Sequence, residues 1–430
     1  MKVGILLRRC RPPIFHAVLF SLLFTLSFGY ALYSGLAIRA DSELRETLTR
    51  HIAVLLRARI DALIAGDDLL LARFYDVDSK YGRWALDHER RRVKYVREWA
   101  SKRGIRFLDA EVDFRIKSLD RRGNSIWVSL VQCARFRYSY DSSPNPHMNT
   151  PYGGDSSGRA SEQGDTFAIG TRHTMEFILK DGEWLVRRDW YTDPLDEDTL
   201  VPEVRPAEES PPSKWPPAKS PSGKPSGSIT NSAPTPPEAA NKSSKPSEPG
   251  GAPGHSGSSE YNREAAVAYA DRYWHEYNPK YKDYTEMGGD CTNFAAQVLF
   301  DPEAGGLPMD GSCYYRSSPL GGGGSRTWVQ TEKLANYLLY SGHAKRIAYG
   351  HYQEVMLPSV SYPDGPIQGL EKGDLIGYEE KGRIEHFAIV VGRDSHGYVL
   401  VNSHTADRYH VPWDLGWDRD TKFWLLKIVR

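Results

Sequence analysis

Residues 203–258 constrain the fold of this chain more than any other segment. Apolar residues nearly vanish there, while proline, serine, glycine and lysine dominate. Such a composition cannot bury a hydrophobic core, so we expect a disordered linker that proline keeps extended. The full chain of 430 residues exceeds one ordinary domain. The sequence therefore predicts two folded regions, an N-terminal region at 41–202 and a C-terminal region at 259–430.

The first 40 residues have the pattern of a targeting segment. Four basic residues precede an apolar run that extends from Ile14 to about Tyr33. This pattern is typical of a signal peptide, and its length also suits an uncleaved membrane anchor. Both alternatives remain open. In either case we expect a secreted or cell-surface protein that meets a membrane only through this segment.

The N-terminal region begins with helix patterns and continues with strand patterns. Apolar residues recur every three or four positions across 44–66, and a more charged helix pattern covers 83–104. Strand patterns follow at 106–120, 125–140 and 167–194, the last being a hairpin around Lys-Asp-Gly. Helices followed by antiparallel strands predict an α+β layer.

By topology alone, this order of elements resembles the cone-shaped folds of the NTF2-like superfamily. No motif accompanies the resemblance, and His173 and Asp189 fit no catalytic pattern. We therefore expect an α+β accessory domain.

The C-terminal region has the same general character. Helix patterns cover 261–278 and 327–342, the second ending at a glycine. Strand patterns follow at 373–380, 384–392, 398–405 and 422–429. This order again predicts an α+β fold.

Cys291, one of four cysteines, stands in the motif GGDCTNFAAQ at 288–297. The apolar spacing after it predicts a helix, for which Asp290 is a suitable N-cap, and two glycines permit a sharp turn before it. In the first helical turn, unsatisfied amides and the helix dipole would lower the pKa of the thiol. A cysteine at a helix start can also be incidental, so this position alone marks only a candidate nucleophile.

A candidate base follows at His386, which begins an apolar strand. If the hairpin turns near Ser395, His386 lies opposite His404 or Asn402, and these even-numbered residues share one face of the sheet. That face can pack against the helix of Cys291. The result is a cysteine, a histidine and a polar residue that orients the histidine. Pairing with His404 places Gly397 in the turn, so His404 is preferred to Asn402.

The C-terminal region resembles the putative amidase domain family of Gram-positive bacteria, a papain-like branch of cysteine hydrolases related to the NlpC/P60 and CHAP wall enzymes. The matching motifs are YNREAAVAYADRYW, NPKY, GGDCTNFAAQVLF, WV with a following YL, KGDLI, IEHFAIVVG and SHTAD. The resemblance implies Cys291 as nucleophile, His386 as base and His404 as third member. One departure is AAQ, where the family often has valine-serine-glutamine.

The expected reaction is acyl transfer from an amide to Cys291, followed by hydrolysis of the thioester. Export and kinship favour peptidoglycan or another peptide as substrate. The Cys291 amide and the hydroxyl of Tyr281 or Tyr284 are candidate oxyanion donors. We expect no cofactor, and no nucleic-acid partner because the 55 basic residues equal the 55 acidic ones.

Two alternatives remain. A metal-dependent amidase would use His386, His404, His410 and Asp407, although no HExxH-type motif is present. The other alternative is a wall-binding or scaffolding protein that has lost its activity.

Overall fold

A computed structural model describes residues 42–140, 164–195, 201, 260–318 and 322–429. The expected targeting segment at 1–40 and the linker at 203–258 lie outside these residues. Within the described ranges, no helix is long and apolar enough to cross a membrane.

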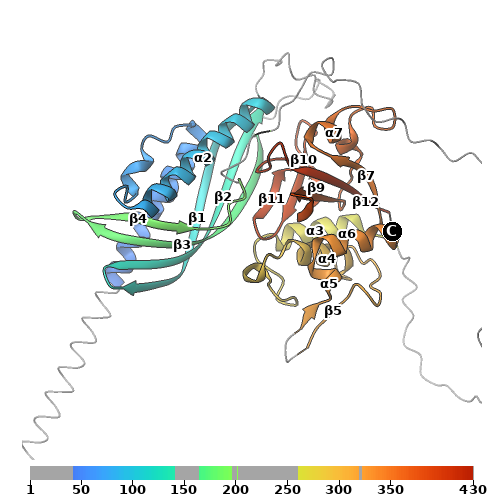
Figure 1. Ribbon diagram of the computed structural model, residues 1–430, viewed down its shortest axis with the longest axis horizontal. Coiled ribbons are helices and arrows are strands. Elements are labelled where there is room, and N and C mark those ends of the chain that lie inside the picture. Colours follow the sequence, from blue (N-terminus) through green and yellow to red (C-terminus); the bar gives the residue numbers. More distant parts are fainter. Residues whose placement is uncertain (1–41, 141–163, 196–200, 202–259, 319–321, 430) are drawn as a thin grey trace, which may run out of the picture.

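The N-terminal region packs two long helices and a short one on one side of a four-stranded antiparallel sheet (Figure 1). Ser79 caps the second helix through its side chain, and Gly104 ends it with φ 62°. Its elements are helical residues 42–65, η1 (Leu71–Phe74), α2 (Lys80–Arg103), β1 (Ile105–Arg122), β2 (Ser125–Tyr140), β3 (Asp165–Lys180) and β4 (Glu183–Trp190). These helices and strands confirm the sequence patterns, including the hairpin between β3 and β4.

The C-terminal region contains a helical layer and a second antiparallel sheet. Gln330 separates two short helices where the sequence pattern predicts one. Its helices are α3 (Arg263–Tyr273), η3 (Thr285–Met287), α4 (Cys291–Phe300), α5 (Arg326–Val329), α6 (Thr331–Tyr340), α7 (Tyr352–Met356) and η4 (Pro366–Gly369). Its strands are β5 (Tyr315–Arg316), β6 (Gly323–Gly324), β7 (Ala344–Gly350), β8 (Leu375–Glu380), β9 (Arg383–Arg393), β10 (Val399–Ser403), β11 (Asp407–Pro412) and β12 (Lys422–Ile428).

Two apolar clusters fill the two faces of this sheet. On one face, α3, α4 and α6 pack against side chains such as Phe387 and Ile389 of β9. On the other face, α7 and Trp413 pack against side chains such as Ala388 and Val390 of the same strand. Successive side chains of β9 point to opposite faces of the sheet, so a residue's position along β9 decides whether its side chain can reach α4.

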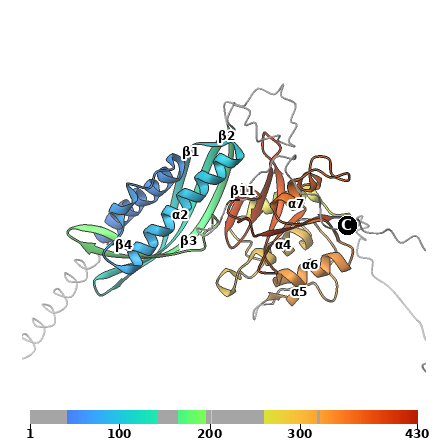
Figure 2. The same ribbon diagram turned by 45° about the horizontal axis from the view of Figure 1, so that its top comes forward.

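The sheets of the two regions are joined into one continuous sheet by the pairing of β3 with β11. β3 pairs with β4 along one half and with β11 along the other, where Gly170 lies opposite Asp407. The order of the resulting ten-stranded sheet is β1-β2-β3-β11-β10-β9-β8-β12-β7, with β4 beside β3. Both views show the two regions side by side (Figures 1 and 2). The composition of the linker predicts few contacts between the regions, and the structure differs from that expectation.

A buried ion pair reinforces the junction. Arg103, at the end of α2, and Asp414, after β11, are both fully buried and form an ion pair. The Asp414 carboxylate also accepts hydrogen bonds from Trp99 Nε1 at 3.2 Å and from the Tyr398 hydroxyl at 2.8 Å. Two residues of the C-terminal region, Val411 and Leu415, belong to the apolar core of the N-terminal region. The regions therefore share a core as well as a sheet.

Candidate active site around Cys291

Cys291 is the first residue of α4, as the sequence predicts. Gly288 and Gly289 precede the helix with φ values of 110° and 115°, which glycine adopts without steric cost. The hydroxyl oxygen of Thr405, itself at φ 78°, accepts hydrogen bonds from the backbone N–H groups of Asp290 and Cys291. The turn that presents the thiol is therefore held from the end of β10.

The thiol is buried. Its Sγ atom lies 3.8 Å from the hydroxyl oxygen of Thr292 and 3.9 Å from the carbonyl oxygen of Glu385. Burial raises the pKa of the Cys291 thiol, although the backbone N–H of Phe387 and the Thr292 hydroxyl act in the opposite direction. The position at a helix start predicts a lowered pKa of the thiol, and the desolvation of the buried thiolate acts against that effect.

Asp290 occupies the N-cap position, but its side chain does not cap the helix. Its carboxylate instead accepts hydrogen bonds from the backbone N–H of Tyr284 and from Asn293 Nδ2, and it contacts His404 Nδ1 at 2.7 Å. The structural role of Asp290 is thus to join α4 to His404.

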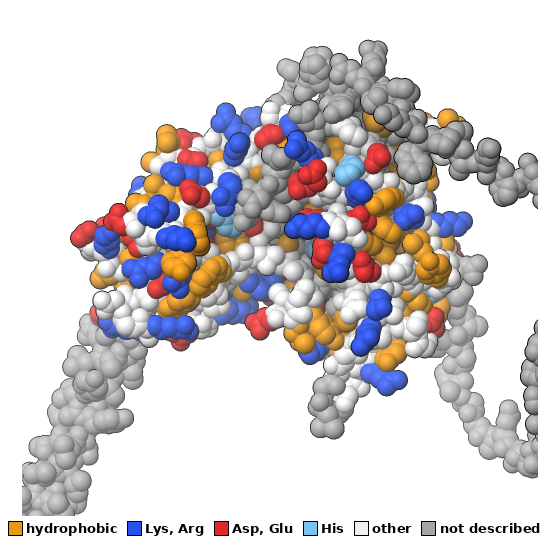
Figure 3. All heavy atoms as spheres, in the orientation of Figure 1, with side chains coloured by type: hydrophobic (Ala, Val, Ile, Leu, Met, Phe, Trp, Pro, Cys, Tyr) orange, Lys and Arg blue, Asp and Glu red, His pale blue; other side chains and the backbone are white. Residues whose placement is uncertain are grey.

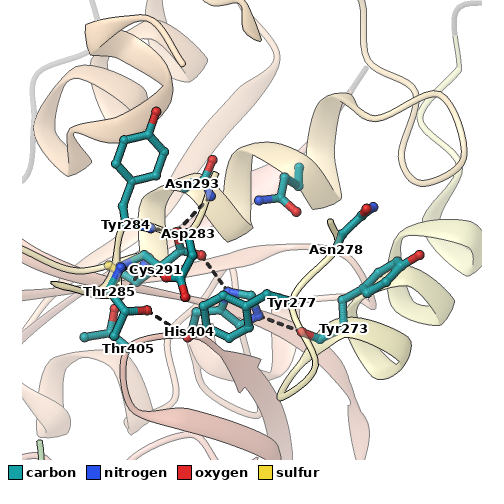
Figure 4. Close-up of polar contacts among 12 residues, drawn as sticks. Tyr273, Tyr277, Asn278, Asp283, Tyr284, Thr285, Cys291, Asn293, His404 and Thr405 are labelled. Atoms are coloured by element: carbon teal, nitrogen blue, oxygen red, sulfur yellow. Dashed lines mark hydrogen bonds and ion pairs between the residues drawn. The ribbon is translucent and has the colours of Figure 1, made fainter. Parts of the chain in front are cut away.

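His404 is fixed on every side. Its ring is stacked between Phe294 and Tyr277, with centroid distances of 3.8 and 3.7 Å. Its Nε2 atom lies 2.6 Å from the carbonyl oxygen of Tyr273, which can only accept a hydrogen bond (Figure 4). Nε2 is therefore engaged by this carbonyl oxygen, and Nδ1 is engaged by the Asp290 carboxylate. Neither nitrogen is available to accept a proton from a thiol or to orient His386.

His386 lies on the opposite face of the sheet from α4. It pairs with Tyr378, and its ring contacts Tyr378 and Trp417 at centroid distances of 5.7 and 5.5 Å. Burial, together with the nearby charge of Arg408, lowers the pKa of His386 to about 3. Its Nε2 atom is buried and has no hydrogen-bond partner. The imidazole is therefore neutral at any pH near neutrality.

A register shift explains this difference from the predicted arrangement. Leu400 pairs with Gly392, but the next residue, Val401, pairs with Val390, so one residue of β9 is left over. Asn402 then lies opposite Ile389 and on the face of α4, away from His386. Because side chains alternate along a strand, one extra residue exchanges the faces. The predicted face shared by His386, Asn402 and His404 is therefore not formed.

The remaining candidate residues are engaged elsewhere. The Asn402 amide donates to Asp271 at 2.9 Å, and the Tyr281 hydroxyl donates to Asp301 at 2.7 Å. The Tyr284 hydroxyl accepts a hydrogen bond from the backbone N–H of Gly324. His410 contacts Asp271 at 2.9 Å. Among the described residues, no group of three or more His, Cys, Asp or Glu side chains could hold a metal ion.

A cavity of about 310 Å³ opens beside the thiol. Cys291, Thr292 and Gly289 form one wall, and Gln330 at the junction of α5 and α6 lies on another. The first residues of β9 complete it. The cavity gives a small ligand access to the side of the helix start where the thiol lies.

The structure adds His275 and Arg172, which the sequence patterns do not place at the site, and both contact Asp407. Asp407 is fully buried and accepts a hydrogen bond from the Tyr277 hydroxyl at 2.9 Å, while His275 Nδ1 lies 2.9 Å away. Arg172 of the N-terminal region forms an ion pair with the same carboxylate at 3.0 Å. The motif SHTAD contains Asp407, but nothing in the sequence indicates that Arg172 would reach it.

Comparisons with known proteins found similarities to a curated relative, to solved structures and to a protein family. The uncharacterized protein YhbB of Bacillus subtilis (strain 168) is 32% identical over an alignment of 158 residues, and the match covers 34% of this chain and 42% of that protein. The chain thus spans less than half the length of this curated relative.

Two solved structures are similar at 15% identity. One is a putative scytalone dehydratase from Novosphingobium aromaticivorans, with a TM-score of 0.22, matched over 40% of this chain and 99% of that chain. The other is an NTF-2 like protein of unknown function from Shewanella oneidensis, with a TM-score of 0.18, matched over 34% of this chain and 98% of that chain.

The family described as putative amidase domain matches residues 260–426. This range contains α4, the cavity beside its first residue and the strands β7 to β12. The resemblance expected from the sequence motifs is therefore confirmed: residues 260–426 of this chain match the putative amidase domain family.

Proposed function

We propose that the C-terminal region hydrolyses amide bonds with Cys291 as the nucleophile. The observation that carries this proposal is the position of the thiol, at the first residue of a helix and in the wall of a cavity. The amidase family match supports the reaction class. Attack of sulfur on the amide carbonyl forms a thioester and releases the amine, and water then hydrolyses the thioester.

His386 is the proposed base. The Glu385 carbonyl and the Phe387 N–H, which belong to its two chain neighbours, both interact with Sγ. The backbone of His386 is therefore adjacent to the sulfur, and its Nε2 has no competing partner. Because the imidazole is neutral and the thiol is protonated, the proton moves when the substrate is attacked, rather than in a resting ion pair.

The proposed substrate is a peptide amide of the bacterial cell wall, cleaved outside the cytoplasm. This part of the proposal rests on the basic and apolar pattern at the N-terminus and on the resemblance to papain-like wall hydrolases. A papain-like arrangement of the C-terminal region is part of the same proposal.

The test is turnover of purified peptidoglycan and of a small peptide amide by the full chain, with products identified by mass spectrometry. We expect iodoacetamide to abolish hydrolysis and EDTA to leave it unchanged. Inhibition by EDTA with resistance to iodoacetamide would refute the thiol mechanism.

One observation favours a second candidate function, a wall-binding protein without turnover. No imidazole among the described residues makes a hydrogen bond with Cys291 Sγ, and the thiol is buried. In that case the full chain would sediment with peptidoglycan and release no product over prolonged incubation.

A further inference from the structure

A second, larger cavity of about 910 Å³ lies between the two regions. One wall is formed by β1, β2, β3 and residues 190–192, and the other by the loop that joins α3 to α4. In both ribbon views this loop extends from the C-terminal region toward the N-terminal strands (Figures 1 and 2). We call this cavity the inter-region cleft.

The walls of the inter-region cleft carry opposite charges. Arg115 and Lys117 of β1 line it on the N-terminal side, and Glu276 and Glu286 line it on the other. All four side chains are exposed, and no hydrogen bond or ion pair joins any of them to another described residue. Elsewhere on the surface shown in Figure 3, basic and acidic side chains are interspersed. In the inter-region cleft the basic side chains of one wall face the acidic side chains of the other wall across an open volume.

The inter-region cleft is connected to the site of Cys291 by one short segment. Tyr277 and Thr285 line the cleft, and the Thr285 hydroxyl donates to the Tyr277 hydroxyl at 3.2 Å. The Tyr277 ring is stacked on His404. The segment continues through η3 to Gly288 and Gly289, which line the cavity beside the thiol. A ligand that lies along η3 would therefore reach both cavities.

We propose that the inter-region cleft binds the charged part of a peptide substrate, one that carries free carboxylates and a free amine. The guanidinium of Arg115 and the ammonium of Lys117 would hold the carboxylates, and Glu276 and Glu286 would hold the amine. A polyanion is disfavoured by the acidic wall, and a neutral glycan would leave all four charges unpaired. This inference rests on the proposed amide hydrolysis at Cys291, since it assigns substrate selection to the N-terminal region.

The probe is a synthetic tetrapeptide with one glutamate, one lysine and a free C-terminal carboxylate. Its control is the same peptide with the carboxylates amidated and the amine acetylated. Binding is measured by calorimetry with the full-length Cys291→Ala chain, so that the result does not depend on turnover.

We expect the charged peptide to bind, the capped peptide to bind at least tenfold more weakly, and binding to weaken as salt is added. The double change Arg115→Gln and Lys117→Gln, made in the Cys291→Ala chain, should weaken binding of the charged peptide at least tenfold. The matched control changes Arg45→Gln and Lys94→Gln, which remove two exposed charges outside the cleft, should leave binding unchanged. Thermal melts verify that both double variants are folded.

Absence of binding of the charged peptide, or equal binding by the two double variants, would overturn the inference. If the charged peptide binds through Arg115 and Lys117 while the unmodified chain hydrolyses no amide, peptide binding by the inter-region cleft is supported and the proposed amide hydrolysis is refuted.

Discussion

Cys291 combines a helix start with nearly complete burial, and burial dominates its ionisation. The thiol pKa is raised and His386 is neutral. A preformed ion pair between thiolate and imidazolium would make the thiol reactive at acidic pH. The structure instead describes a thiol that must lose its proton during the reaction.

This state of the thiol predicts the pH dependence of its alkylation. We expect the rate of modification of Cys291 by iodoacetamide to rise about tenfold per pH unit from pH 6 to 8, without a plateau. The measurement is quenched alkylation followed by mass spectrometry of the peptide that contains Cys291, with the Cys313 peptide as an internal reference. A rate that is already constant below pH 6 would show that an ion pair exists.

The lowered pKa of His386 predicts how the free energy of unfolding depends on pH. Its pKa is about 3 when folded and about 6.5 when unfolded, so the unfolded chain binds the additional proton between these values. The contribution of the neutral His386 ring to the free energy of unfolding is fully present above about pH 6.5. It is lost as the pH falls toward 3, at about 1.4 kcal/mol per pH unit.

Urea unfolding from pH 7 to 4 tests this prediction. The change His386→Gln should reduce the loss of stability on acidification, while His396→Gln, at an exposed histidine, should behave like the unmodified chain. Identical pH slopes for His386→Gln and the unmodified chain would show that the ring is not buried and neutral.

At the scale of helices and strands, local patterns were sufficient for most of the fold. The β3–β4 hairpin and the start of α4 follow from alternation, turn residues and glycine positions within a few residues of each other. The register shift in β9 depends on packing across two strands, and no residue pattern marks it. Cys291 could therefore be placed correctly, while the faces of His386 and Asn402 could not.

The pairing of β3 with β11 could not be predicted from the sequence either. It joins two strands that lie on either side of the linker at 203–258, and that linker's composition predicts few contacts between the regions. Gly170 marks the closest approach. A Cβ atom there would lie 2.6 Å from His275 Nδ1 and 3.0 Å from Asp407 Cβ. Only glycine therefore fits opposite Asp407.

This close approach predicts the effect of Gly170→Ala. We expect the free energy of unfolding to fall by about 1–3 kcal/mol, since the added methyl group must displace His275 or separate the strands. Gly392→Ala in β9 is the matched control, because nothing lies within 4 Å of its added Cβ. Urea unfolding of both variants is the measurement, and equal stability of the two would contradict the observed strand pairing.

For the whole molecule, the linker separates the two regions in sequence but not in space. The shared sheet and the buried pair of Arg103 and Asp414 predict that both regions unfold together. Residues 259–430 alone would leave Asp414 without its guanidinium and Val411 and Leu415 without their core. This differs from the few contacts between the regions that the composition of the linker predicts.

A double-mutant cycle measures this coupling. Arg103→Ala and Asp414→Ala should each cost about 3–5 kcal/mol, because each leaves one buried charge unpaired, and the double variant should cost less than their sum. Calorimetry of the unmodified chain should show one cooperative transition. Two separate transitions with additive single effects would mean that the regions are independent.

The most direct test of the account is to trap the acyl-enzyme. A full chain mixed with a slowly hydrolysed peptide ester and quenched in acid should carry the acyl group on the peptide that contains Cys291, in a bond that hydroxylamine cleaves. Cys291→Ala should show no adduct and should lose turnover by about 10⁴-fold or more. Turnover that persists in Cys291→Ala, or turnover by the unmodified chain without any adduct on Cys291, would contradict a thiol mechanism.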